Sequence, residues 1–261
     1  MIRVGVFGAA GRMGRTVCEA VVQDPELELV AAVDPQHAGL DLRNVAKVES
    51  DLHVAPAADA LVDAGAEVVV DFTVLGAARE NLAFAAVNGI HAVVGTTGFT
   101  EGDLERIRAD FTTSNCIIAP NFAIGAVLMM RFAELAAPWF ETAEVIELHH
   151  DQKVDAPSGT AMLTVERMAG ASSDWAPDPT TREVLPGARG SKGPADIRVH
   201  SVRLRGLVAH QEVLLGTTGQ SLAIRHDSYD RSSFMPGVVL AVKQVQSRPG
   251  LTVGLDALLD L

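Results

Sequence analysis

The stretch VGVFGAAGRMGRT, residues 4–16, places three glycines between an apolar run and a helix-like segment. Residues 2–7 have the length and β-branched content of a buried strand, and residues 12–22 have apolar residues at helical spacing. Glycine is costly in regular structure unless the backbone needs a positive φ or something must approach it closely. The sequence therefore predicts a strand, a tight glycine turn and a helix, with room for a ligand at the turn.

Each glycine of this turn has a possible role in a dinucleotide-binding βαβ unit. The first permits the tight turn, the second lets the backbone approach the pyrophosphate, and the third lets the helix pack on the strand. Gly8, Gly11 and Gly14 can fill these roles, although their spacing is G-x-x-G-x-x-G. A glycine-rich turn that binds nothing is the alternative. A second predicted strand, residues 26–34, favours the cofactor site because it ends in Asp34, where this fold places a carboxylate for the ribose hydroxyls.

Composition narrows the possible classes of protein. A length of 261 residues favours two domains, and 48% hydrophobic residues suffice for a packed core without a membrane-spanning run. We expect no signal peptide, and two isolated cysteines, Cys18 and Cys116, indicate a reducing cytoplasm and no metal site. The net charge of −12 argues against a nucleic-acid partner. A small anion remains possible, because charges are screened over about 8 Å.

Strand and helix signals alternate through the first half of the chain. The further strand-like runs are residues 67–74, 90–97 and 115–122, with a helix between the first two that ends at Asn88-Gly89. Thr100 and Asp103 have the spacing of a capping box. This alternation predicts an α/β fold: a Rossmann-like, doubly wound parallel sheet that forms a dinucleotide-binding domain over residues 1–122. Ligands of such sheets lie at the carboxyl ends of the strands, although ordinary turns have the same composition.

The pattern changes after residue 122. A helix at 125–137 is followed by segments with period-two alternation, which predict a second α+β domain, residues 123–235, with a mixed or antiparallel sheet. An exposed edge or face of that sheet could support self-association. Residues 175–196 form a long loop, which is typically functional or disordered. The C-terminal part, about 236–261, is expected to return to the first domain.

The segment ELHHDQKVDAPSGTA, residues 147–161, gathers side chains that carry protons next to a helix start. His149 and His150 follow a strand and Lys153 lies three residues further on. Neighbouring strand residues point to opposite faces, so the histidines need not share one role. A helix beginning at Ser158 presents backbone N–H groups and a dipole that favour a substrate carboxylate, and an ordinary serine N-cap is the alternative. The histidines lack a third ligand at metal-binding spacing.

Six segments together resemble the 4-hydroxy-tetrahydrodipicolinate reductase family, formerly called dihydrodipicolinate reductases. They are VGVFGAAGRMG, VVVDFT, HAVVGTTGF, IAPNFAIGAVL, ELHHDQKVDAPSGTA and IRHDSYDRSSFMPGVVLAV, spread over nearly the whole chain. The HHxxKxDAPSGTA element is the most specific. The resemblance implies hydride transfer from a reduced nicotinamide to a cyclic unsaturated imine dicarboxylate, giving tetrahydrodipicolinate for lysine and diaminopimelate synthesis. It also implies a homotetramer built through the second domain's sheet.

The resemblance also assigns roles to residues. It makes His149 a proton donor and acceptor and Lys153 a proton donor. The expected substrate contacts are His150, Ser158, Gly159 and Thr160, with Ser158 taken from its place at the helix start. The expected cofactor contacts are Gly8, Ala9, Ala10, Gly11, Arg12, Met13, Asp34, Gly95, Thr96, Thr97, Ala119, Pro120, Asn121 and Phe122.

The cofactor can be NADH or NADPH. Asp34 favours a free ribose 2′-hydroxyl, and Pro35 and Gln36 follow it where some members carry an arginine for a 2′-phosphate. Arg12 could still reach such a phosphate, so we expect both cofactors to work, with NADH at least as good. Two alternatives remain: another NAD(P)-dependent reductase of a small carbonyl or imino acid, and a non-catalytic nicotinamide-nucleotide sensor. A sensor would tolerate the loss of both His149 and Lys153.

Overall fold

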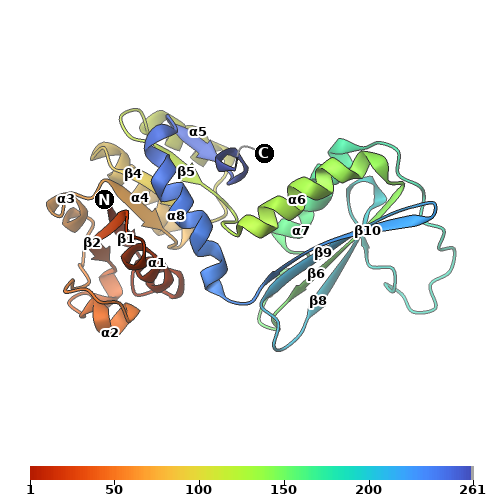
Figure 1. Ribbon diagram of the computed structural model, residues 1–261, viewed down its shortest axis with the longest axis horizontal. Helices are drawn as coiled ribbons and strands as arrows, with labels where there is room; N and C mark the ends of the chain where they lie inside the picture. Colours follow the sequence, from red (N-terminus) through yellow and green to blue (C-terminus); the bar gives the residue numbers. More distant parts are fainter. Residues whose placement is uncertain (260–261) are drawn as a thin grey trace. The chain divides into compact units, whose positions relative to one another are not determined.

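The computed structural model describes residues 1–259, and its contacts divide the chain into two compact units (Figure 1). The first unit comprises Met1–Phe122 and Arg231–Leu261, and the second comprises Ala123–Asp230. The chain returns to the first unit at Arg231, whereas the sequence places this return at about residue 236. The difference arises because a 3-10 turn, Arg231–Phe234, packs against the helix that follows it.

A parallel sheet of six strands forms the centre of the first unit, in the order β11-β5-β4-β3-β1-β2. The strands are β1 (Ile2–Phe7), β2 (Leu27–Val33), β3 (Val68–Asp71), β4 (His91–Val94), β5 (Cys116–Ile118) and β11 (Leu251–Val253). This order confirms the predicted doubly wound parallel sheet. Sequence reasoning missed β11, because a strand of three residues between Gly250 and Gly254 gives almost no periodic signal.

Helices cover both faces of this sheet (Figure 1). They are α1 (Arg12–Gln23), α2 (Leu42–Ala46), α3 (Asp59–Asp63), α4 (Leu75–Val87), α5 (Glu101–Asp110) and α8 (Met235–Gln244). The helices α1 and α8 pack together and contact the central strands, while α3, α4 and α5 share a core cluster with the opposite face. Thr100 and Asp103 form the predicted capping box at the start of α5. Both cysteines are buried thiols, and burial raises the pKa of Cys18 to about 12.

The second unit contains a mixed sheet in the order β10-β9-β6-β8-β7, which confirms the predicted sheet type. Its strands are β6 (Thr142–His149), β7 (Ser191–Lys192), β8 (Arg198–Arg203), β9 (Ala209–Thr217) and β10 (Gln220–Ser228). The strand β6 is parallel to β8 and antiparallel to β9. Helices α6 (Ile124–Ala136) and α7 (Gly159–Ala171) pack on this sheet (Figure 1).

Ion pairs fasten the long loop before β8 to the rest of the second unit. Arg189 donates to Glu144 of β6 at 2.6 Å and lies 3.5 Å from Asp178. Arg198 also binds Asp178, at 2.5 Å. The loop is therefore held on the sheet by charges that come from both of its ends.

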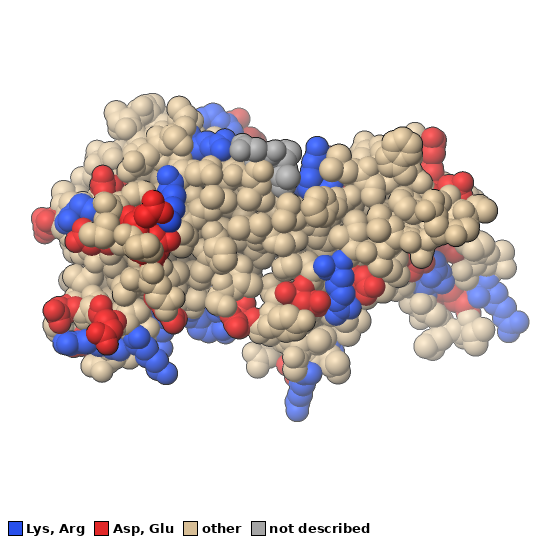
Figure 2. Space-filling model, in the orientation of Figure 1, with Lys and Arg blue, Asp and Glu red and all other residues tan. Residues whose placement is uncertain are grey.

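Charged side chains of both signs lie interspersed on the face drawn in Figure 2. The acidic residues that give the chain its net charge of −12 thus lie among lysines and arginines on this face. No helix within residues 1–259 has both the length and the apolar character needed to cross a bilayer.

Candidate active site

The glycine turn after β1 has the close packing that its sequence predicts. Gly8 adopts a φ of +63°, which favours glycine, and its carbonyl accepts from the N–H of Gly11 at 2.9 Å. A Cβ placed on Gly14 would lie 2.0 Å from the Gly8 oxygen, so α1 rests directly on the turn. Gly11 is the N-cap of α1 and no side chain caps this helix. The first turn of α1 is thus suited to an anionic ligand.

Asp34 joins the end of β2 to the glycine turn. Its carboxylate accepts from the N–H of Ala10 at 3.2 Å and from the N–H of Gln36 at 3.1 Å, and His37 Nδ1 lies 3.1 Å away. A carboxylate offers about four acceptor positions. These three partners therefore fix its orientation and leave capacity for a ribose hydroxyl.

The turns after β3 and β4 are tied to each other by polar side chains. Asp71, at the end of β3, is 1% exposed and accepts from the N–H and hydroxyl of Thr73 at 2.6 and 2.7 Å. The carboxylate also accepts from Asn81 of α4 at 2.8 Å. The hydroxyl of Thr96 donates to the carbonyl of Thr73 at 2.8 Å. This network ties the predicted cofactor turn after β4 to the turn after β3.

Phe72 and Phe122 form an aromatic pair at the same edge of the sheet. A Cβ on Gly95 would lie 1.9 Å from the ring of Phe72, so only glycine fits there. The Phe72 ring lies 5.6 Å from that of Phe122, centroid to centroid. The predicted cofactor residues lie in turns that follow the carboxyl ends of parallel strands of one sheet, except Arg12 and Met13, which begin α1. The tight turn, the uncapped helix and the oriented carboxylate fit a dinucleotide.

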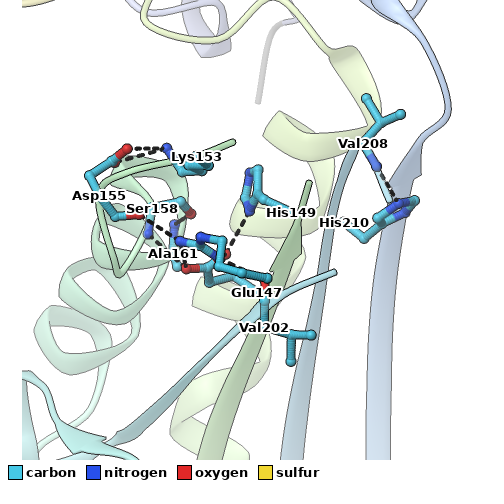
Figure 3. A network of polar contacts seen from close by, with 10 residues as sticks. Glu147, His149, Lys153, Asp155, Ser158, Ala161, Val202, Val208 and His210 are labelled. Atoms are coloured by element: carbon cyan, nitrogen blue, oxygen red, sulfur yellow. Dashed lines mark hydrogen bonds and ion pairs between the residues drawn. The ribbon is translucent and has the colours of Figure 1, made fainter. Parts of the chain in front are cut away.

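In the second unit, His149 ends β6 and is bound to a buried acid (Figure 3). Its Nδ1 lies 2.6 Å from Oε2 of Glu147, two residues earlier on the same face of the strand. Glu147 has no exposed surface, and both its oxygens also accept from Arg203 of β8, each at 2.8 Å. The imidazole is therefore held by a carboxylate that is itself held by the Arg203 guanidinium.

Burial and neighbouring charges shift the pKa values of His149 and Glu147. Burial lowers the pKa of His149 below its ordinary value, the Glu147 carboxylate opposes this, and the charge of Lys153 adds to the lowering. Burial alone would raise the pKa of Glu147. Hydrogen bonds, chiefly from Arg203, outweigh burial and keep that pKa below its ordinary range. Glu147 is therefore ionised at neutral pH.

Lys153 and His150 lie on the loop between β6 and α7. The ammonium of Lys153 binds both carboxylate oxygens of Asp155 at 2.8 Å, as Figure 3 shows. His150 is exposed, and its Nδ1 accepts from the N–H of Gln152 at 3.2 Å. Lys153 and His149 are close enough for the ammonium charge to affect the imidazole.

At the start of α7, Ser158 forms the ordinary serine cap that the sequence left open as the alternative. The hydroxyl oxygen of Ser158 accepts from the N–H of Ala161 at 3.2 Å, and the N–H of Ser158 donates to Glu147 at 3.2 Å. A Cβ on Gly159 would meet nothing within 4 Å, so the helix start is open at that residue. Because the Ser158 side chain serves as cap, the backbone of Gly159 and Thr160 offers the better contact for an anion.

Sequence reasoning did not assign Glu147, Arg203 or Asp155 to this cluster. Glu147 could have been found, because it lies two residues before His149 and shares its strand face. Arg203 is 54 residues beyond His149 in the chain, and only the pairing of β6 with β8 brings it there. Within residues 1–259 no group of three or more His, Cys, Asp or Glu has the arrangement of a metal site.

A nucleotide-binding sheet and a separate unit with titratable groups at a helix start define a two-domain, nucleotide-dependent oxidoreductase. Family models described as the N-terminus and the C-terminus of dihydrodipicolinate reductase match residues 2–122 and 125–259. The chain belongs to the dihydrodipicolinate reductase family. This confirms the resemblance seen in the motifs, the oxidoreductase class and the use of a nicotinamide cofactor.

Curated relatives and solved structures agree with this family. The chain is 52% identical to 4-hydroxy-tetrahydrodipicolinate reductase of Nocardia farcinica, covering 100% of this chain and 99% of the relative. It is 50% identical to the Corynebacterium urealyticum enzyme of that name, with full coverage of both. Dipicolinate-bound dihydrodipicolinate reductase from Paenisporosarcina sp. TG-14 matches with a TM-score of 0.86 and 41% identity, over 98% of this chain and 99% of that one. An amine dehydrogenase from Mycobacterium smegmatis, 14% identical over 98% of this chain and 95% of that one, shares only the fold, with a TM-score of 0.68.

Proposed function

We infer that this chain is a cytoplasmic reductase that converts 4-hydroxy-tetrahydrodipicolinate to tetrahydrodipicolinate, a step of lysine and diaminopimelate synthesis, with NADH or NADPH. The observation that carries this proposal is the arrangement at the end of β6, where His149, Lys153 and the open start of α7 come together. The relatives that share the family carry the same activity in their names.

The proposed cofactor contacts fall into three groups, one for each part of the dinucleotide. Gly8, Ala9, Ala10, Gly11, Arg12 and Met13 would face the pyrophosphate at the start of α1, and Asp34 would accept from ribose hydroxyls. The nicotinamide half would be held by Gly95, Thr96, Thr97, Ala119, Pro120, Asn121 and Phe122, in the turns after β4 and β5. When bound, the reduced nicotinamide supplies a hydride.

The second unit supplies the charge and the protons that reduction of the ring requires. The backbone of Gly159 and Thr160, with His150 and the helix start at Ser158, binds the carboxylates of the substrate. The 4-hydroxyl group of the substrate leaves as water to give the conjugated ring. Hydride addition to that ring leaves negative charge that a nearby acid must quench. Lys153 donates that proton from its ammonium. His149, whose Nδ1 is bound to Glu147, exchanges its proton at Nε2.

The reaction can be tested by generating the substrate with the preceding synthase and following the loss of nicotinamide absorbance. We expect turnover with both cofactors and a kcat/KM for NADH at least equal to that for NADPH, because Asp34 disfavours a 2′-phosphate. Asp34→Asn keeps one acceptor oxygen and should move the preference towards NADPH. Omission of the synthase is the control. No turnover would overturn the function, and a preference for NADPH of more than about tenfold, or about 1.4 kcal/mol, would overturn the cofactor assignment.

We also propose a homotetramer that assembles through the second unit's sheet. The face of this sheet that carries Ile146, Leu148 and Leu214 points away from the buried face with Val145 and Val213. Leu214 is 37% exposed, so this face presents some apolar surface to solvent. Light scattering should give about four times the chain mass of 27.5 kDa. A mass equal to one chain would contradict this assembly.

A further inference from the structure

Glu147 is a buried carboxylate, and each of its two oxygens accepts two hydrogen bonds. Its Oε2 accepts from His149 and from Nη1 of Arg203, and its Oε1 accepts from Nη2 of Arg203 and from the N–H of Ser158. A buried carboxylate is costly unless it is paired and hydrogen-bonded, and this one is both. The proposed reaction does not by itself require a buried carboxylate at this position.

The contact between Glu147 and His149 decides which ring nitrogen carries the proton. An ionised carboxylate can only accept, so Nδ1 of His149 must be protonated at 2.6 Å from it. In the neutral ring the lone pair then lies on Nε2, and in the charged ring Nε2 carries the second proton. A proton can therefore leave or reach Nε2 while the bond to Glu147 persists.

Glu147 also opposes every other influence on the charge of His149. Burial lowers the pKa of this histidine, and the positive charges of Lys153 on the loop and Arg203 on β8 lower it further. The carboxylate alone among the causes identified for His149 raises it. Without Glu147, the pKa of the imidazole would fall further below its ordinary value, and the neutral ring would be free to take either tautomer.

Arg203 fixes Glu147 and the loop that leads into α7. Its guanidinium binds both oxygens of the carboxylate, a geometry that restricts direction as well as distance. The same group donates to the carbonyls of Asp155 and Val202 at 2.6 and 2.8 Å. The pair thus connects β6, β8, the loop with Lys153 and, through the N–H of Ser158, the start of α7.

We propose that Glu147 is the positioning residue that sets the tautomer and orientation of His149, with Arg203 holding Glu147 in place. This inference rests on the proposed reductase function for its kinetic consequence, but the tautomer itself can be measured without turnover. Glu147 contacts neither substrate nor cofactor in this account and acts only through the histidine.

The test combines kinetics with nitrogen-15 NMR of the histidine rings. Glu147→Gln has nearly the same shape but lacks the charge, and we expect kcat to fall about 10²-fold while the KM for the cofactor stays unchanged. The pH at which His149 titrates in the kcat profile should fall as well. In the wild type, the His149 signals should show the proton on Nδ1, and the variant should lose this preference.

A matched control lies on the same strand. Glu144 also binds a histidine and an arginine, with His200 Nε2 at 2.7 Å and Arg189 at 2.6 Å, but it lies at the other end of β6. Glu144→Gln should leave kcat and the His149 signals unchanged. If Glu147→Gln does not fold because Arg203 is left uncompensated, the double variant Glu147→Gln with Arg203→Gln removes both charges and should show the same loss.

The outcomes separate this inference from the function on which it rests. A wild type without reductase activity overturns the function, and the NMR signals then still decide the role of Glu147. An active wild type whose Glu147→Gln or double variant keeps its kcat and pH profile overturns the inference. A wild-type His149 with its proton on Nε2 overturns it as well.

Discussion

Lys153→Ala is expected to lower kcat by about 10²–10⁴-fold while the affinity for the nicotinamide cofactor stays unchanged. The ammonium is bound to Asp155, and the proposed function makes it the donor of a proton to the reduced ring. His149→Ala should have a similar effect on kcat. Fluorescence titration with the reduced cofactor and steady-state rates in the coupled assay measure the two quantities separately.

The control for Lys153 is a lysine with a similar partner elsewhere in the second unit. Lys192 binds Asp196 at 3.2 Å, and both side chains are largely exposed. Exposed ion pairs contribute about 0–1 kcal/mol to stability, so Lys192→Ala should change neither folding nor kcat. Undiminished turnover in both Lys153→Ala and His149→Ala would remove the assigned roles and favour a nucleotide sensor.

Gly14→Ala should have the largest effect in the first unit. The added Cβ would lie 2.0 Å from the Gly8 carbonyl oxygen, a backbone atom that cannot rotate away, so α1 or the turn must move. Overpacking of this kind typically costs about 1–3 kcal/mol in the free energy of unfolding. The same movement displaces the proposed pyrophosphate site, so we expect weaker cofactor binding along with a lower Tm.

Gly76 provides the matched substitution for this experiment. It lies in α4 of the same unit, and a Cβ there would meet nothing within 4 Å. Gly76→Ala should therefore be neutral or stabilise the helix by up to about 1 kcal/mol. If Gly14→Ala matched Gly76→Ala in both Tm and cofactor affinity, the close packing of the glycine turn would be needed neither for stability nor for cofactor binding.

The sequence predicts those parts of the fold whose signals are local. The turn from β1 to α1, the cap of α5 and the cap of α7 each depend on residues within a few positions of one another. The family motif likewise keeps His149 and Lys153 within five residues of chain. Parallel order along the first sheet follows from the alternation of strands and helices.

What the sequence could not predict depends on contacts between distant segments. Arg203 reaches Glu147 only because β8 pairs in parallel with β6, and neither residue belongs to a recognisable motif on its own. The short strand β11 joins β5 after the chain has passed through the whole second unit. The bond between Lys153 and Asp155 is local, but side-chain geometry is needed to distinguish it from two separate charges.

The most direct test of the central claim is a crystal structure with a nicotinamide cofactor and pyridine-2,6-dicarboxylate bound together. We expect a carboxylate of that ring within about 2.7–3.2 Å of the backbone N–H groups at Gly159 and Thr160. His149 Nε2 and Lys153 Nζ should face the same ring, with the His149 Nδ1 still bound to Glu147. A dicarboxylate bound away from the start of α7, or an imidazole and an ammonium turned away from it, would contradict the account.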